Sequence, residues 1–246
     1  MEIADYIQVV ETQGQSLADA AQKAGVDAPV TTCPDWRVRD LVRHQGAVHR
    51  WAASYLAEGH TERRPFEDTP DLDGDELLSW FREGHRHLVD TLTGARPDVA
   101  CWAFFAAPSP LAFWARRQAH ETTVHRVDAE SALTSSPEAA GAAIGTDFAV
   151  DGIDELLFDF HGRERSRMRS DLPRVLRVRA TDANAAWTVR ITQDPPVAER
   201  GTGGEADCEV SGPAARLYLA LWNRLPFAAV SGDASIAELW RERSGV

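Results

Sequence analysis

The chain lacks any apolar run long enough to cross a membrane as a helix, which takes about 20 consecutive apolar residues. Its N-terminus also lacks the basic stretch, the apolar core and the small-residue cleavage site of a secretory signal. Basic residues are fewer than acidic ones. The chain has 26 Lys and Arg but 38 Asp and Glu, which gives a formal net charge of -12. A surface of this sign repels phosphate backbones and anionic lipids. We therefore expect a cytoplasmic protein that binds neither nucleic acid nor membranes.

Cysteine is also rare. The 246 residues contain only Cys33, Cys101 and Cys208, which lie far apart. This spacing fits neither a disulfide framework nor a Cys-x-x-Cys metal site, so we expect reduced thiols that are buried or half-buried. The remaining composition excludes extensive disorder, since 43% hydrophobic and 26% charged residues are typical of a globular chain.

The first half of the chain has the hydrophobic periodicity of helices. Apolar residues recur at helical spacing in three stretches, over residues 3–24, 38–57 and 77–92. A fourth helix is expected to begin at Ser109-Pro110, where a cap residue precedes a proline in the first turn, and to end near residue 132. The sequence therefore predicts four helices separated by loops.

The second half of the chain has a different pattern. A connecting helix is expected over residues 147–168, after a break rich in Ser, Pro and Gly at 134–145. Period-two alternation, which is typical of strands, then appears in three short stretches, residues 175–180, 187–191 and 208–210. Two further helices are expected, one beginning at residue 213 and the other near residue 233.

This order of elements predicts an α+β fold with two domains. Residues 1–145 would form a helical bundle. Residues 146–246 would form the connecting helix and a small α/β domain with an antiparallel sheet.

One face of the predicted fourth helix carries polar residues where a core-facing stripe should be apolar. At about 100° per residue, Gln118, Glu121, His125 and Asp128 fall within that stripe. Burying these groups unpaired would be costly, so something must compensate them. Glu121 and His125 are four residues apart and can reach one metal ion, although the same spacing also suits a simple side-chain pair.

The second predicted helix offers a third metal ligand. His44 lies in its apolar stripe, whereas His49 falls about 100° away, at the edge of the stripe or in solvent. Two imidazoles and one carboxylate leave a coordination position open, which is typical of catalytic zinc, and the same set suits non-haem iron. Asp128 could accept the second ring N–H of a ligand histidine, and Gln118 could orient a water or a substrate.

The remaining histidines are expected to lie outside this site. His85 and His87 flank the stripe of the third helix on opposite sides, which favours positions at its rim or in solvent. His120 points away from the core stripe on the same helical wheel. His161 has no companion that would make a site.

Two segments resemble motifs of a known family. Residues 33–44, CPDWRVRDLVRH, are similar to the Pro-Gly-Trp-Thr-x-x-Asp-Leu-x-x-His signature of DinB-like metal-binding bundles, with Asp35 in place of the glycine and Arg37 in place of the capping Thr. Residues 117–128, RQAHETTVHRVD, resemble the Arg-x-x-Glu-x-x-x-His-x-x-Asp element of the same bundles. Together with residues 210–224, which resemble a helix and arginine of the second domain, they resemble the mycothiol-dependent maleylpyruvate isomerase family of actinobacteria.

The resemblance implies both a fold and a metal site. The fold would be an up-down four-helix bundle followed by a small domain like that of sterol carrier proteins. His44, Glu121 and His125 would hold zinc, and Arg224 would reach the active site from the second domain.

The resemblance also implies a mycothiol-dependent enzyme that acts on a small electrophile. The metal would deprotonate the thiol, which would then either isomerise maleylpyruvate from cis to trans or remain attached in an S-transfer, while Arg224 would hold a substrate carboxylate. Two alternatives stay open: a non-catalytic module that binds a small molecule and has a structural metal, and a thiol-independent metal-assisted hydrolase. We expect a monomer or a homodimer.

Overall fold

A computed structural model of the protein describes residues 1–66, 69–134 and 143–245. Its contacts divide the chain into two compact units, Met1–Pro137 and Glu138–Val246. Most of the predicted break at 134–145 lies outside the described residues, and the domain boundary expected after residue 145 stays a prediction.

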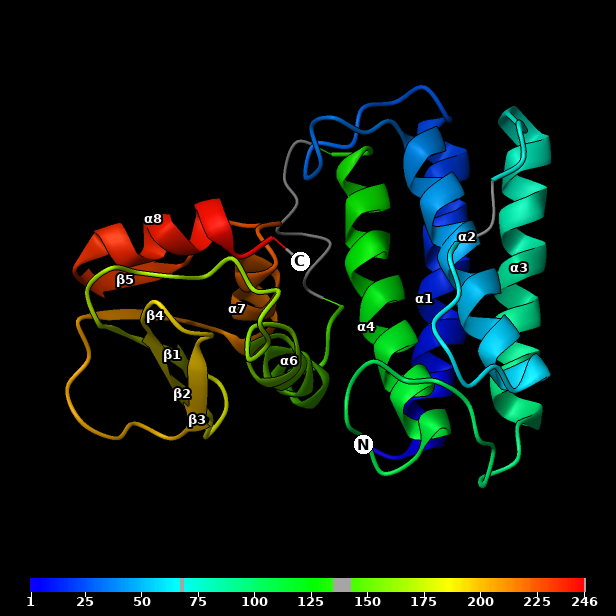
Figure 1. Ribbon diagram of the computed structural model, residues 1–246. Coiled ribbons are helices and arrows are strands. Elements are labelled where there is room, and N and C mark those ends of the chain that lie inside the picture. The colour runs from blue at the N-terminus through cyan, green and yellow to red at the C-terminus, as the bar shows by residue number, and fades with distance from the viewer. Residues whose placement is uncertain (67–68, 135–142, 246) are drawn as a thin grey trace. The chain divides into compact units, whose positions relative to one another are not determined.

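The described part of the first unit contains four long helices (Figure 1). They are α1 Ile3–Ala24, α2 Val38–Glu58, α3 Gly74–Gly94 and α4 Pro110–Ser131. All four match the predicted helices. The start signal of α4 is confirmed, because the Ser109 hydroxyl accepts a hydrogen bond from the Ala112 N–H at 3.1 Å.

Neighbouring helices bury the core of this unit between them. The largest contacts are those of α1 with α4 and of α2 with α3. Leu17, Leu41 and Phe81 are fully buried in the core cluster, one from each of the first three helices. The fourth helix is buried on most of its circumference, polar residues included. This burial brings the polar stripe predicted on α4 into the interior of the bundle.

The described residues of the second unit, from 143 on, form two consecutive helical segments followed by a five-stranded sheet. The helices of this unit are α6 Thr146–Asp154, the π-helix η1 Glu155–Phe160, α7 Ala214–Leu221 and α8 Ala234–Arg243. The strands are β1 Arg174–Ala180, β2 Ala186–Ile191, β3 Val197–Arg200, β4 Cys208–Gly212 and β5 Ala229–Gly232. The prediction of a connecting helix as far as residue 168 was wrong, because helical structure ends at Phe160.

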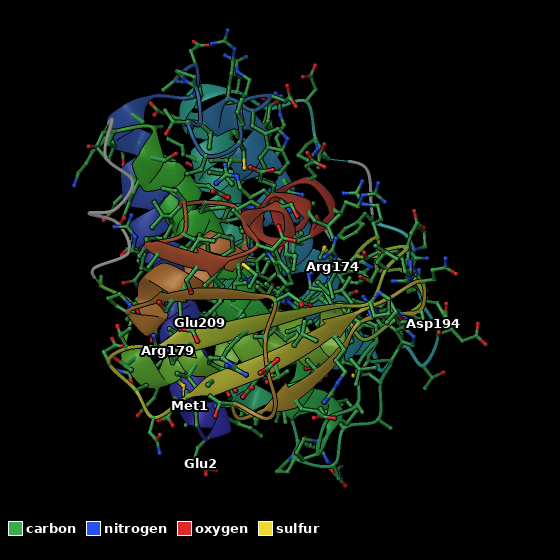
Figure 2. The ribbon with its side chains drawn as sticks, turned by 90° about the vertical axis from the view of Figure 1, so that its left-hand side faces the viewer. Met1, Glu2, Arg174, Arg179, Asp194 and Glu209 are labelled. Carbon is green, nitrogen blue, oxygen red and sulfur yellow. The ribbon has the colours of Figure 1, made fainter. Side chains whose placement is uncertain are left out.

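The sheet has the strand order β3-β2-β1-β4-β5, and the α+β class is confirmed. It is mixed, which corrects the predicted antiparallel sheet, because β1 pairs in parallel with β4 and its Val178 stands opposite Val210. The period-two pattern of β1 is confirmed: Val178 is buried, whereas Arg179 points outward and pairs with Glu209 at 2.7 Å (Figure 2).

The three cysteines are free thiols, with Cys208 buried and Cys33 and Cys101 half-buried, as predicted. Among the described residues, no helix is long and apolar enough to span a bilayer.

Candidate metal centre

The three predicted ligands come together between α2 and α4. One ligand atom each from His44, Glu121 and His125 lie within 4.8 Å of one another. Nε2 of His125 is 3.4 Å from Oε1 of Glu121, and Nε2 of His44 is 3.6 Å from the same oxygen. A tetrahedral zinc ion with bonds of about 2.0–2.1 Å spaces its ligand atoms roughly 3.4 Å apart. The two distances to Glu121 therefore match the spacing that such an ion requires, and the two histidine nitrogens lie within 4.8 Å of each other.

The centre is accessible from one side. The His44 side chain is 38% exposed, whereas that of His125 is 9% exposed. Three protein ligands leave a tetrahedral ion with one further position, which is the arrangement of catalytic zinc sites. The accessible side at His44 leaves room for a small molecule to approach that position.

A tryptophan of the loop before α2 holds the two imidazoles. The Trp36 indole stacks on His125 with ring centroids 5.9 Å apart, and its centroid lies 5.1 Å from that of His44. The loop is fixed by its backbone, since the Val30 N–H donates to the Trp36 carbonyl at 2.9 Å. Trp36 thus restricts both ligand rings, a role the sequence reasoning did not assign although the residue belongs to the recognised motif.

Asp128 orients the ring of His125. Its carboxylate accepts a hydrogen bond from Nδ1 of His125 at 2.9 Å and another from the Thr32 hydroxyl at 2.7 Å. Because Nδ1 is taken up by Asp128, Nε2 is directed toward Glu121 and is the ring nitrogen left to bind a metal ion. The hydrogen bond expected between Asp128 and a ligand histidine is therefore present, whereas the contribution of Thr32 was not foreseen.

The electrostatics of the site keep the carboxylate charged. Burial raises the pKa of Glu121, but hydrogen bonds from His125 and His44, together with the charge of Arg117, outweigh burial and hold this pKa well below its usual range. The Arg117 guanidinium donates to Glu121 at 2.9 Å. Arg117 was quoted from the sequence as part of the family element but was given no role, although its position four residues before Glu121 on a helix could have indicated one.

His125 binds a proton strongly when no ion is present. Burial lowers its pKa, but hydrogen bonds to Asp128 and Glu121 outweigh burial and raise the pKa to about 9. A metal ion must therefore displace this proton, so the affinity of the site for metal depends on pH.

Two of the other histidines are buried, which corrects their predicted positions at a rim or in solvent. His49 is completely buried on α2, with Nε2 at 3.0 Å from the Thr122 hydroxyl of α4. Burial and the nearby His85 hold the pKa of His49 well below its usual value. His85 is buried as well, and its Nε2–H donates to the Val10 carbonyl at 3.0 Å.

His120, expected to point away from the core, is also buried and meets the Tyr6 ring edge-on at 6.3 Å between centroids. His87 is exposed, as predicted. The wrong positions share one cause. The helical wheel assumes one buried face per helix, but α2, α3 and α4 each pack against more than one neighbour.

The last two candidate residues lie in different units. Gln118 is buried on α4, and its Oε1 has no hydrogen-bond partner among the described residues. Arg224 follows α7 in the second unit, where its guanidinium donates to the Trp222 carbonyl at 2.8 Å. The catalytic roles expected for Gln118 and Arg224 stay predictions.

Comparisons with known proteins cover both units. Residues 9–130 match the model of the mycothiol maleylpyruvate isomerase N-terminal domain, and residues 147–238 match that of the C-terminal domain of the same proteins. A crystal structure of the mycothiol-dependent maleylpyruvate isomerase has the same fold, with a TM-score of 0.60 at 12% identity over 89% of this chain and 88% of that chain. A histidine-to-alanine mutant of that isomerase gives a TM-score of 0.62 with the same identity and coverage. No curated protein matches the sequence.

Proposed function

The chain belongs to the mycothiol maleylpyruvate isomerase family, and from this premise we propose that it is a zinc-dependent enzyme that activates mycothiol for attack on a small electrophile. The observation that carries the proposal is the convergence of His44, Glu121 and His125 within 4.8 Å on a side of the bundle that remains accessible. We expect a cytoplasmic monomer or homodimer.

Residues around the ligands support this chemistry. When bound there, a divalent metal lowers the pKa of a coordinated thiol, so that a strong nucleophile is available at neutral pH. Arg117 keeps Glu121 ionised, and Asp128 holds Nδ1 of His125 so that Nε2 is the nitrogen directed to the ion. Trp36 limits the movement of the imidazoles. The preorganised ligands therefore need little rearrangement to bind an ion.

The proposed reaction is the cis-trans isomerisation of maleylpyruvate. The thiolate sulfur forms a bond to one carbon of the cis double bond. The π electrons of the double bond then move into the conjugated carbonyl, which leaves a carbon–carbon single bond. The remaining carbon–carbon single bond rotates, and expulsion of the thiolate restores the double bond in the trans form. Arg224 would pair with a substrate carboxylate, as a guanidinium does in bidentate geometry. In an S-transferase, the thiol would remain attached.

The test is an assay of the zinc-loaded full chain with maleylpyruvate, in the presence and absence of mycothiol. We expect turnover that requires both the thiol and the metal and is lost in His125→Ala. Conjugation of a model electrophile without isomerisation would assign S-transfer. Turnover without thiol would instead indicate metal-assisted hydrolysis. Stoichiometric zinc without either activity would favour a non-catalytic binding module.

A further inference from the structure

A cavity of about 550 Å³ lies beside α2, and none of the three metal ligands lines it. Its described lining residues come from α2, α3 and the segment between them, and include Ala47, Trp51, Ser54, Phe66 and Trp80. Ala47 follows the ligand His44 by three residues on α2, so their Cβ atoms are about 5–6 Å apart. The cavity therefore begins about one helical turn along α2 from the ligand His44.

Two glycines inside helices make room for the walls of this cavity. A Cβ at Gly46 of α2 would clash with the indole of Trp80, and a Cβ at Gly84 of α3 would clash with the guanidinium of Arg50. Arg50 is fixed further by a hydrogen bond to the Trp80 carbonyl at 2.7 Å and by its position 4.0 Å from the centroid of that indole. Glycine destabilises a helix interior relative to alanine, so Gly46 and Gly84 lower the stability of α2 and α3 while they leave space for these side chains.

The lining combines aromatic faces with hydrogen-bonding groups. Trp51 stacks on Phe66 with centroids 4.6 Å apart, and its indole N–H is already used in a hydrogen bond to the Arg64 carbonyl. Around these rings lie the guanidinium of Arg50 and the hydroxyl of Ser54. The Ser54 hydroxyl donates to the Trp51 carbonyl at 2.9 Å but its oxygen can still accept a hydrogen bond, and a guanidinium has five N–H donors to share. A sugar ring suits the lining, since its C–H bonds pack on an aromatic face while its hydroxyls form hydrogen bonds.

We propose that this cavity binds the sugar portion of the thiol cosubstrate, with the cysteinyl arm passing Ala47 to reach the metal centre. The proposal rests on the proposed function, because mycothiol is a cysteine derivative of glucosaminyl inositol. The aromatic walls recognise the sugar, while the metal centre receives the sulfur.

The probe for this cavity is glucosaminyl inositol, which has the sugar but no thiol and so cannot bind the metal through sulfur. Calorimetry and tryptophan fluorescence measure its binding to the zinc-loaded full chain. We expect saturable binding that competes with mycothiol. Ser54→Trp, which fills the cavity, should abolish binding without changing the zinc content.

A matched pair of substitutions separates loss of contact from general damage. Phe66→Ala removes a 52% exposed ring from the cavity, and Phe158→Ala removes a 37% exposed ring from η1 in the other unit. We expect the first to weaken sugar binding and to raise the KM for mycothiol about three- to tenfold at unchanged kcat, which corresponds to the loss of one aromatic contact. The second should change neither quantity.

The outcomes distinguish this proposal from the proposed function. If mycothiol supports turnover but the sugar neither binds nor competes, or if Ser54→Trp binds it as well as wild type does, the cavity proposal is overturned and the enzymatic proposal survives. If no thiol-dependent turnover is found, direct calorimetry of the sugar still decides the cavity proposal.

Discussion

Asp128→Asn is the substitution that most directly probes how the protein prepares His125 for a metal ion. The carboxylate lies 2.9 Å from Nδ1 of His125 and is completely buried. Asparagine keeps the shape of the side chain but removes the charge that orients and polarises the imidazole. Loss of such an outer partner lowers metal affinity about 10- to 100-fold, or roughly 1.4–2.7 kcal/mol. We expect a loss within this range when measured at pH 9.

The pH dependence of the loss gives a sharper test. In the wild type, metal must displace the proton of a histidine whose pKa is raised to about 9, so its apparent affinity should rise about tenfold per pH unit up to that value. In Asp128→Asn, one cause of the raised pKa is gone, and the rise should level off at a lower pH. The affinities of the two proteins should therefore converge as the pH falls.

Competition with a zinc chelator at several pH values measures both effects. Asp154→Asn is the control, because Asp154 also accepts side-chain hydrogen bonds, from Trp187 and Arg200 at 2.8 Å, but lies in the second unit. Its zinc affinity should equal that of the wild type. Equal affinities for Asp128→Asn and wild type at pH 9, or parallel pH profiles, would refute the orienting role of Asp128.

Three further predictions concern the histidines and one glycine. His125→Ala should abolish zinc binding whereas His49→Ala should retain it, as measured by elemental analysis; equal loss in both would mean that the ligand assignment is wrong. Burial lowers the pKa of His161 from 6.5 to about 4, so the unfolded state takes up its proton first and stability falls by up to about 3 kcal/mol as the pH drops through this window. His161→Phe should flatten that loss in chemical unfolding followed by tryptophan fluorescence, and an unchanged acid slope would contradict the reasoning. Gly14→Ala should destabilise the bundle by about 1–3 kcal/mol, because the added Cβ would clash with the buried imidazole of His85. Gly94→Ala is the control and should not destabilise it, because its Cβ would meet no atom within 4 Å. The denaturant midpoints of the two variants test this difference.

The long periodic elements could be predicted from sequence because their patterns reflect one strong local signal. The start of α4 at Pro110 is an example, since a capping hydroxyl and a proline act within one turn. The strands Val197–Arg200 and Ala229–Gly232 were missed. Both have four residues and lie at the edges of the sheet, and the second is exposed throughout, so neither shows the alternation of a half-buried strand.

The metal site could be inferred because Glu121 and His125 share one face of one helix and their burial required compensation. The surroundings could not. His85, for example, is buried because α1 offers the carbonyl of Val10, a contact between residues 75 positions apart that no single-helix pattern contains. Trp36 and Thr32 likewise reach the site from a loop, where periodicity gives no information.

Elemental analysis of the purified wild type beside His44→Ala tests the central claim most directly. We expect about one zinc per wild-type chain and little or none in the variant, since α2 contributes His44 to complete the ligand pair on α4. A wild type that binds no metal when zinc is supplied, or a variant that retains a full equivalent, would contradict it.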